Sequence, residues 1–195
     1  MSPESGIAEG PDGKPRCWWA LGTPDYVDYH DSEWGRPLHG ESELYERLTL
    51  EAFQSGLSWL TILRKRENFR QAFDGFDIER VAAYGDKDVA RLMSDDGIVR
   101  NRKKIDAAIT NAGAARELHA VGETLNELVW SFAPAPDSRP APKRGADVPA
   151  ITPESTALAK ELKRRGFVFV GPTTAYATMQ AAGLVNDHLE GCAFR

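Results

Sequence analysis

The sequence GIVRNRKKI, residues 97–105, joins one predicted helix to the next. The segment before it, 86–97, has helical character and stops at Gly97, and the alanine-rich segment after it is helical as far as Val121. Four positive side chains follow the turn: Arg100, Arg102, Lys103 and Lys104. A glycine-containing turn that leads into a helix can present backbone N–H groups to a phosphate. The stretch therefore predicts a helical hairpin, whose turn is either a phosphate site or an ordinary basic loop.

Helical spacing also dominates the rest of the chain. Apolar residues recur every three or four positions over 42–53, with Ser42 as the expected N-cap, and again over 62–73. Thr152 followed by proline is a typical helix start, and Gly166 is a typical helix end. Only FVFVG, just after that glycine, resembles a strand. We therefore expect an all-α fold of roughly eight helices in one compact unit.

Two segments do not fit the helical pattern. Residues 1–16 contain three glycines, three prolines and little that is apolar, which predicts a disordered tail that ends at Cys17. Residues 133–153 contain six prolines, which excludes a helix or a central strand and predicts a long proline-rich loop. The expected folded unit is therefore a single domain over residues 17–195.

The net charge of −5 argues, taken alone, against nucleic acid as a partner. The charge is unevenly distributed, however, because residues 1–51 carry eleven acids and four bases whereas residues 52–195 carry eighteen acids and twenty bases. The bases gather at 64–66, 100–104 and 163–165, although each group alone also fits a solvated helix face. This distribution keeps DNA open as a partner.

The sequence contains no run of eighteen apolar residues, and its first residues lack the basic and then apolar pattern of a signal peptide. We therefore expect a cytoplasmic protein with no membrane partner. No feature of the sequence demands more than a monomer.

Cysteine and histidine occur near both ends of the chain: Cys17, His30, His188 and Cys192. The second pair is spaced i and i+4, so that its thiolate and imidazole can share one metal ion. Two cysteines and two histidines complete a tetrahedral zinc shell with no open position, which would make the metal structural. The spacing is not that of a compact zinc finger, and it fits inert buried side chains equally well.

One carboxylate lies on an otherwise apolar helix face. Glu51 shares the face with Leu48 and Phe53, where a free carboxylate is costly to bury without a partner, unless it points outward. Several aromatic residues are candidates to lie near it: Trp19, Tyr26, Tyr29, Trp34 and Trp59. Such rings are usually ordinary core, but together with a carboxylate they also fit a pocket for a flat, cationic ring.

Six segments of the chain, in order and spacing, resemble the bacterial 3-methyladenine DNA glycosylase I family. They are CWWALGTPDYVDYHDSEWG, LEAFQSGLSWLTILRKRENFRQAF, GIVRNRKKI, WSF, RGFVFVG and GLVNDHLEGC, which together span residues 17–192. The resemblance implies a helix-hairpin-helix glycosylase fold with two helical lobes and a structural zinc that joins the N- and C-terminal segments. It also implies excision of 3-methyladenine from double-stranded, alkylated DNA.

The resemblance assigns roles residue by residue. It implies one Zn²⁺ per chain, held by Cys17, His30, His188 and Cys192, and no organic cofactor. It implies that Glu51 is the carboxylate of the pocket, and that five aromatic residues bind the base: Trp59, Tyr29, Tyr26, Trp19 and Trp34. The family's hairpin falls on residues 97–104. Trp18, where a small residue is expected, and the proline-rich loop depart from the family pattern.

These assignments lead to a mechanism in which the damaged base rotates out of the duplex into the pocket. We expect Leu57 to fill the vacated space and the hairpin to hold phosphates through Gly97, Arg100, Arg102, Lys103 and Lys104. Hydrolysis would be monofunctional, with no lysine nucleophile and no assigned general base. Asp106 lies too near the turn for that role, and Glu117 is a weak alternative.

Two other classes of protein also fit parts of the sequence. A zinc-containing module that binds damaged DNA without cutting it would carry the basic hairpin but would not need a carboxylate among aromatic rings. A hydrolase of free nucleosides would not need the basic groups, and it would show no salt-dependent affinity for DNA.

Overall fold

The structure is a computed structural model that describes residues 6–135 and 138–195, and it is mostly helical. The α-helices are α1 (Pro24–Ser32), α2 (Glu41–Gln54), α3 (Trp59–Ala72), α4 (Ile78–Ala82), α5 (Asp86–Ser94), α6 (Arg102–Ala120), α7 (Leu125–Trp130), α8 (Pro153–Arg164) and α9 (Pro172–Ala181). Three short 3₁₀ helices are η1 (Trp18–Gly22), η2 (Asp74–Phe76) and η3 (Gly145–Asp147). The helical class predicted from the sequence is confirmed. Among the described residues, no helix has the length and apolar character needed to cross a bilayer.

Local sequence signals explain where several helices begin and end. The Thr152 side chain accepts a hydrogen bond from the backbone N–H of Ser155 and caps α8, and Gly166 follows this helix with a φ of +93°. Both were predicted. Ser42 is not the N-cap of α2. The N-cap is Gly40, so the helix begins at Glu41, two residues earlier than predicted.

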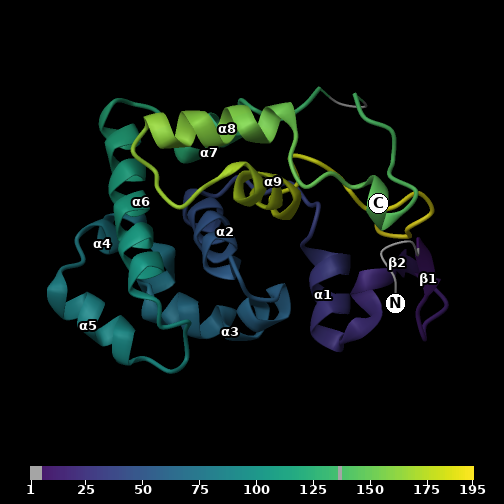
Figure 1. Cartoon of the computed structure of the whole chain (residues 1–195), viewed down its shortest axis with the longest axis horizontal. Coiled ribbons are helices and arrows are strands. Elements are labelled where there is room, and N and C mark those ends of the chain that lie inside the picture. The colour runs from purple at the N-terminus through teal and green to yellow at the C-terminus, as the bar shows by residue number, and fades with distance from the viewer. Residues whose placement is uncertain (1–5, 136–137) are drawn as a thin grey trace.

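Helix α2 lies at the centre of the helical part of the molecule. It packs against α3, α6, α7 and α9, and every side chain from Leu44 to Phe53 is buried. Figure 1 shows α2 between these helices, whereas α1 and both termini lie at one end. The Tyr45 hydroxyl donates a hydrogen bond of 2.8 Å to the carbonyl of Ala108, which ties α2 to α6. The position of α2 matters because Glu51 lies on it.

The N-terminal segment is ordered where the sequence predicted a disordered tail. Strands β1 (Ile7–Glu9) and β2 (Pro15–Cys17) form an antiparallel hairpin, so the prediction is wrong for residues 7–16, while residues 1–5 lie outside the described part. Two groups from elsewhere hold this hairpin. Arg16 is buried and pairs with Asp31 at 2.8 Å, and the backbone N–H of Ala193 donates to the carbonyl of Pro15 at 2.9 Å.

Two loops complete the fold. The proline-rich segment between α7 and α8 contains only η3 as a regular element among its described residues, and its Pro142 carbonyl accepts a hydrogen bond from the N–H of Glu190. The FVFVG segment forms no strand. Instead, the Asn111 side chain of α6 accepts from the N–H of Val168 at 2.8 Å and donates to its carbonyl at 3.1 Å, which takes the place of a neighbouring strand.

The predicted hairpin is formed by α5 and α6. The Asn101 side chain caps α6, and the N–H of Gly97 donates to the Asp95 carboxylate at 2.8 Å. Lys65 of α3 donates to the carbonyl of Asp96 at 2.9 Å and so fixes the turn. A methyl group at Gly97 would lie 3.1 Å from Cβ of Asn68, which makes glycine the residue that fits this close approach.

Lys104 belongs to the core of the fold and not to the surface of the hairpin. Its side chain is buried, and its Nζ donates to the carbonyls of Phe53 at 2.7 Å and Ser55 at 2.5 Å. These are unpaired carbonyls at the C-terminal end of α2, where a lysine is favourable. The structure does not support the prediction that Lys104 contacts DNA, because its ammonium group is held by the carbonyls of Phe53 and Ser55.

We predict that Lys104→Met lowers the free energy of unfolding by about 3 kcal/mol, because it removes charge-assisted hydrogen bonds and leaves two carbonyls without a donor. The exposed neighbour gives a matched control, and Lys103→Met should change stability by less than about 0.5 kcal/mol. Urea denaturation of both variants measures the difference. Equal stabilities would contradict this structural role of Lys104.

Candidate active site and metal centre

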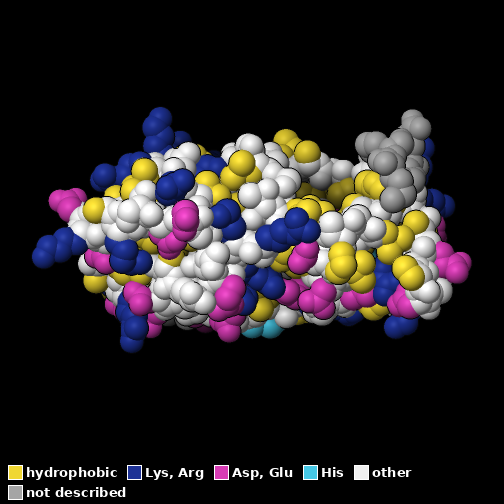
Figure 2. Space-filling model, turned by 90° about the horizontal axis from the view of Figure 1, so that it is seen from below, with side chains coloured by type: hydrophobic (Ala, Val, Ile, Leu, Met, Phe, Trp, Pro, Cys, Tyr) yellow, Lys and Arg dark blue, Asp and Glu magenta, His cyan; other side chains and the backbone are white. Residues whose placement is uncertain are grey.

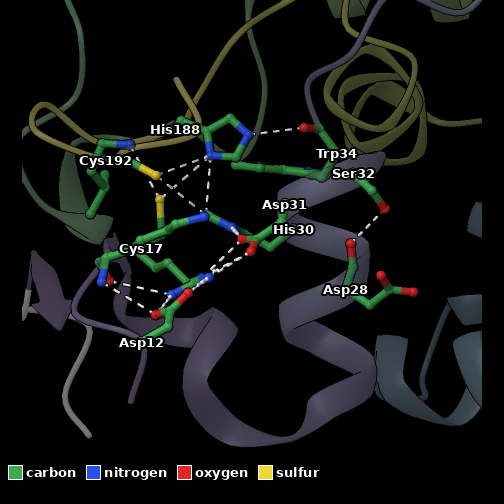
Figure 3. A network of polar contacts seen from close by, with 12 residues as sticks. Asp12, Cys17, Asp28, His30, Asp31, Ser32, Trp34, His188 and Cys192 are labelled. Carbon is green, nitrogen blue, oxygen red and sulfur yellow. Dashed lines mark hydrogen bonds and ion pairs between the residues drawn. The ribbon is translucent and has the colours of Figure 1, made fainter. Parts of the chain in front are cut away.

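The four candidate metal ligands meet at one buried centre. They are Cys17 at the end of β2, His30 on α1, and His188 and Cys192 in the C-terminal segment, and their ligand atoms all lie within 4.8 Å of one another. The Cys192 sulfur lies 3.6 Å from Nε2 of His30 and 3.5 Å from Nδ1 of His188. Figure 3 shows the four side chains pointing toward a common point. The structure thus brings together residues that lie up to 175 positions apart.

The surroundings of the two imidazoles fit a metal ion. Nδ1 of His30 lies 2.8 Å from the Asp31 carboxylate, and Nε2 of His188 donates to the Trp34 carbonyl at 2.9 Å. These contacts leave Nε2 of His30 and Nδ1 of His188 facing each other at 3.1 Å, with lone pairs directed at the same point. Such an outer carboxylate and carbonyl are what orient imidazole ligands in metal sites. The donor set therefore forms a candidate metal site.

A pocket of about 350 Å³ lies beside the metal centre. All six residues that the sequence placed in a pocket line it: Trp19, Tyr26, Tyr29, Trp34, Glu51 and Trp59. They come from η1, α1, the turn that follows α1, the end of α2 and the start of α3. Three further lining residues were missed, of which Gln54 lies in the QSGLSW motif, whereas Ala177 and Gln180 of α9 carried only a helical pattern.

The wall of the pocket and the metal centre share two tryptophans. The Trp19 ring meets the His30 ring edge-on at 5.1 Å and the Trp34 ring at 5.0 Å. Trp34 also supplies the carbonyl that orients His188. These ring contacts run from the candidate metal ligand His30 to the pocket wall, so the two sites are packed directly against each other.

Glu51 is a buried carboxylate with an unusual pKa. Burial raises the pKa of Glu51 to about 8, and the positive charge of Arg47, one helical turn away, opposes this rise. Arg47 is buried as well and pairs with Glu33, which Arg66 also holds at 2.6 Å. Burial favours the neutral acid, but the hydrogen bonds from Arg66 and Arg47 hold the pKa of Glu33 near 2. Glu33 is therefore ionised and neutralises only one of the two arginines that bind it. The cluster of Arg47, Arg66 and Glu33 keeps a net positive charge near Glu51.

Aromatic rings provide flat surfaces and a donor around Glu51. The Tyr29 and Trp59 rings lie 5.3 Å apart at an angle of 48°. Burial, and then the charge of Glu51, raises the pKa of the Tyr29 hydroxyl, so that it stays protonated. Nε1 of Trp59 is buried and has no hydrogen-bond partner among the described residues. The aromatic side chains of the pocket can thus pack against the two faces of a flat ring, while polar groups of the pocket bind the donors at the edge of that ring.

The QSGLSW turn lies at the mouth of this pocket, between α2 and α3. Gly56 has a φ of +82°, which glycine adopts without strain, and it turns the chain so that Leu57 is 42% exposed. Gln54 and Trp59, which flank the turn, both line the pocket. An exposed leucine is thus held next to the opening.

The predicted basic groups differ in how free their charges are. In the hairpin, Arg100, Arg102 and Lys103 are exposed, although Arg102 also pairs with Asp106 at 2.8 Å. Figure 2 shows Lys and Arg side chains projecting from the end of the molecule that carries α5 and the start of α6. The group at 64–66 is mostly occupied inside the protein, since Arg66 binds Glu33 and Lys65 binds the hairpin turn. Of these two basic groups, the one in the hairpin therefore has more positive charge available to a ligand than the one at residues 64–66.

This chain is similar in sequence to two curated DNA-3-methyladenine glycosylases. DNA-3-methyladenine glycosylase 1 of Escherichia coli (strain K12) is 47% identical over 177 residues, which is 91% of this chain and 95% of that protein. DNA-3-methyladenine glycosylase of Haemophilus influenzae is 42% identical and covers 91% of this chain and 96% of its own length.

Solved structures of 3-methyladenine DNA glycosylase I are similar to this chain in fold as well as in sequence. A crystal structure of 3-methyladenine DNA glycosylase I has a TM-score of 0.86 and 48% identity, and covers 91% of this chain and 98% of its own. A crystal structure of a variant of another 3-methyladenine DNA glycosylase I, in complex with 3-methyladenine, has a TM-score of 0.84 and 34% identity, and covers 91% of this chain and 96% of its own. The profile of the family described as "Methyladenine glycosylase" matches residues 19–195. Since this match spans the pocket and three of the four candidate metal ligands, the chain belongs to the methyladenine glycosylase family.

Proposed function

We propose that this protein is a DNA-3-methyladenine glycosylase, which releases the damaged base from double-stranded DNA and leaves an abasic site. The observation that carries the proposal is the pocket in which a buried carboxylate, Glu51, lies among five aromatic side chains. Relatives from two bacteria carry the name of this activity, and one solved relative holds 3-methyladenine. Base excision repair of alkylated DNA is the resulting role.

Methylation at N3 gives the base a positive charge while it is attached to deoxyribose. In the proposed reaction the oxygen of water bonds to the anomeric carbon and the bond from this carbon to the base breaks. The electron pair of that bond neutralises the cationic base, and the proton of water passes to solvent. No acid catalyst is needed because the base leaves as a neutral molecule. The protein's task is therefore to select and orient the flipped nucleotide.

Glu51 and the aromatic residues would perform this selection. Trp59 and Tyr29 provide faces for the flipped ring, and Trp19, Tyr26 and Trp34 provide further walls. The Glu51 carboxylate accepts hydrogen bonds from the amino edge of the base. A cationic base favours the ionised carboxylate, so that binding and loss of the Glu51 proton are linked. A normal base, which is neutral, would bind in this pocket with less favourable free energy.

Contacts with the duplex would come from the turn at the pocket mouth and from the hairpin. Leu57 is the proposed wedge that occupies the space left by the flipped nucleotide. The exposed Arg100, Arg102 and Lys103 are the proposed phosphate contacts. Gly97 is left out of this set, because its backbone N–H already donates to the Asp95 carboxylate. Asp106 is held by Arg102, which is a further reason to assign it no role as a general base.

Zn²⁺ is the metal that we propose for the Cys17, His30, His188 and Cys192 site. Two thiolates and two imidazoles are a tetrahedral zinc donor set, and they leave no position for substrate. When bound, the ion supplies structural cross-linking and no step of the reaction. The four residues would then hold β2, α1 and the C-terminal segment together, and no organic cofactor enters the mechanism.

The central test is release of free 3-methyladenine from methylated duplex DNA, with 7-methylguanine as the control base. We predict that Glu51→Gln lowers the rate of excision by roughly 10- to 100-fold. The variant loses a hydrogen bond to a charged group in the transition state, which costs about 1.5–3 kcal/mol. In the wild-type protein, excision should rise with pH through about 8, because the carboxylate form of Glu51 increases there. Glu51→Gln should lose this pH dependence. Full activity of the variant would refute the role of Glu51.

Arg47 gives a second prediction on the same carboxylate. Arg47→Met removes the cation that opposes protonation of Glu51, so the pKa of Glu51 should rise further and the rising limb of the pH profile should move to higher pH. Arg70→Met is the matched control, since Arg70 lies on α3 and pairs with Glu46 away from the pocket. Identical pH profiles for the wild type and Arg47→Met would contradict the electrostatic coupling.

For the metal, we predict one zinc per chain by elemental analysis, and no zinc in His188→Ala. The variant should unfold at a temperature lower by roughly 10 °C, because about 3–4 kcal/mol of lost stability corresponds to that shift in a chain of this size. His39→Ala, which alters an exposed histidine outside the site, serves as control. A wild-type protein without stoichiometric zinc, or one whose unfolding is unaffected by a chelator, would argue against the metal.

A further inference from the structure

Gln180 and Asp187 form a polar pair at the α9 side of the base-binding pocket. Gln180 lines the pocket, whereas Asp187 lies behind it in the C-terminal segment and is only 3% exposed. We propose that Asp187 is a positioning residue, which turns the side-chain amide of Gln180 so that its carbonyl oxygen accepts a hydrogen bond from the exocyclic amino group of the bound base. The inference rests on the proposed function and adds to it a determinant of specificity at the 6-position of the purine.

The contacts of Asp187 decide which end of the Gln180 amide faces it. Nε2 of Gln180 donates to Oδ2 of Asp187 at 2.9 Å. The same oxygen accepts a hydrogen bond from the Tyr176 hydroxyl, and the Arg139 guanidinium donates to Oδ1 at 3.3 Å. A carboxylate beside a guanidinium offers acceptors only, so the NH₂ group of Gln180 is the end that pairs with it. The reverse orientation would place two acceptors against each other.

The carbonyl end of the amide is left for the pocket. Oε1 of Gln180 accepts no hydrogen bond from any described residue, yet it is not a buried atom. Since Gln180 lines the pocket, this is the open space that Oε1 reaches. The backbone of Gln180 is held as well, because its carbonyl accepts from the N–H of Gly35 at 3.0 Å. An acceptor without a partner is therefore supported from behind in the wall of the pocket.

Two acceptors in one pocket match an amino group. Glu51 belongs to α2 and Gln180 to α9, so the two side chains reach the pocket from different helices. The 6-amino group of 3-methyladenine has two N–H bonds, one for each acceptor. A purine with oxygen at the 6-position would bring a third acceptor against these two and leave all of them without a donor. The pair therefore selects a 6-amino over a 6-oxo purine.

The test compares the affinities for free 3-methyladenine and for 3-methylhypoxanthine, in which an oxygen replaces the amino group, at pH 9, where Glu51 is ionised. The readout is the ratio of the two affinities. Gln180→Met should lower this ratio by roughly 3- to 10-fold, because one hydrogen bond to the amino group is lost. Asp187→Asn should lower it at least as much, since the amide introduced there donates to Gln180 and turns its NH₂ group toward the pocket.

An exchange of acid and amide provides a rescue. In the double variant Gln180→Glu with Asp187→Asn, the amide introduced at position 187 donates to the carboxylate introduced at position 180, which again offers an acceptor to the pocket. The ratio should return toward the wild-type value, a recovery that a purely structural role of Asp187 does not produce. In the Gln180→Met background, Asp187→Asn should leave the ratio unchanged, because the side chain through which it acts is absent.

Two controls separate selectivity from stability. Tyr176→Phe removes another hydrogen bond to Asp187 and should lower thermal stability without changing the ratio, because Gln180 keeps its own partner. Gln71→Met alters an exposed glutamine of α3 and should change neither quantity.

The outcomes distinguish the two residues. An unchanged ratio in Gln180→Met overturns the whole inference. A lowered ratio in Gln180→Met without a change in Asp187→Asn, or without recovery in the exchanged variant, refutes the positioning role of Asp187. If Asp187→Asn does not fold, the exchanged variant, which retains both kinds of group, decides that role. None of these results alters the proposed function, which fails separately if the wild-type protein releases no 3-methyladenine from methylated duplex DNA.

Discussion

The junction between the two ends of the chain is the constraint on which the rest of the structure depends. Four candidate metal ligands from β2, α1 and the C-terminal segment converge at one buried point, which closes almost the whole chain into a loop. Bringing together the two ends of so long a loop costs chain entropy, which weak contacts alone offset poorly. Additional contacts support the junction, among them the pairing of Arg16 with Asp31 and the hydrogen bond from Ala193 to Pro15. The aromatic wall of the pocket is built directly on this junction.

In the proposed mechanism, burial of Glu51 provides selectivity at a cost in stability. An ionised carboxylate in an apolar environment is unfavourable, and the fold offsets this only in part through Arg47, which is itself held by Glu33. The acid is therefore poised between its charged and neutral forms in the range where cells work. A cationic ligand shifts this balance, whereas a neutral ligand does not. In the proposed mechanism, discrimination thus comes from the environment of the carboxylate and not from the carboxylate alone.

Sequence reasoning located the pocket and the metal ligands because their residue types are rare and their motifs are distinctive. It failed where the decisive partner lies far away in the chain. The hairpin of residues 7–17 depends on Asp31 and Ala193, which no local pattern reveals. Lys104 was assigned to the surface because three basic neighbours are there, although helical phase turns it toward the end of α2. Gln180 carries no local signal, since only the packing of α9 brings it to the pocket.

Trp34 belongs to both sites, but through different parts of the residue. Its ring lines the pocket, while its backbone carbonyl orients His188. A change of side chain at this position can therefore reshape the recognition of the base and leave the imidazole in place. A change in backbone conformation there would alter both sites together. In this protein the pocket can thus accept a change of side chain at Trp34, whereas an insertion or deletion there would displace the carbonyl that holds His188.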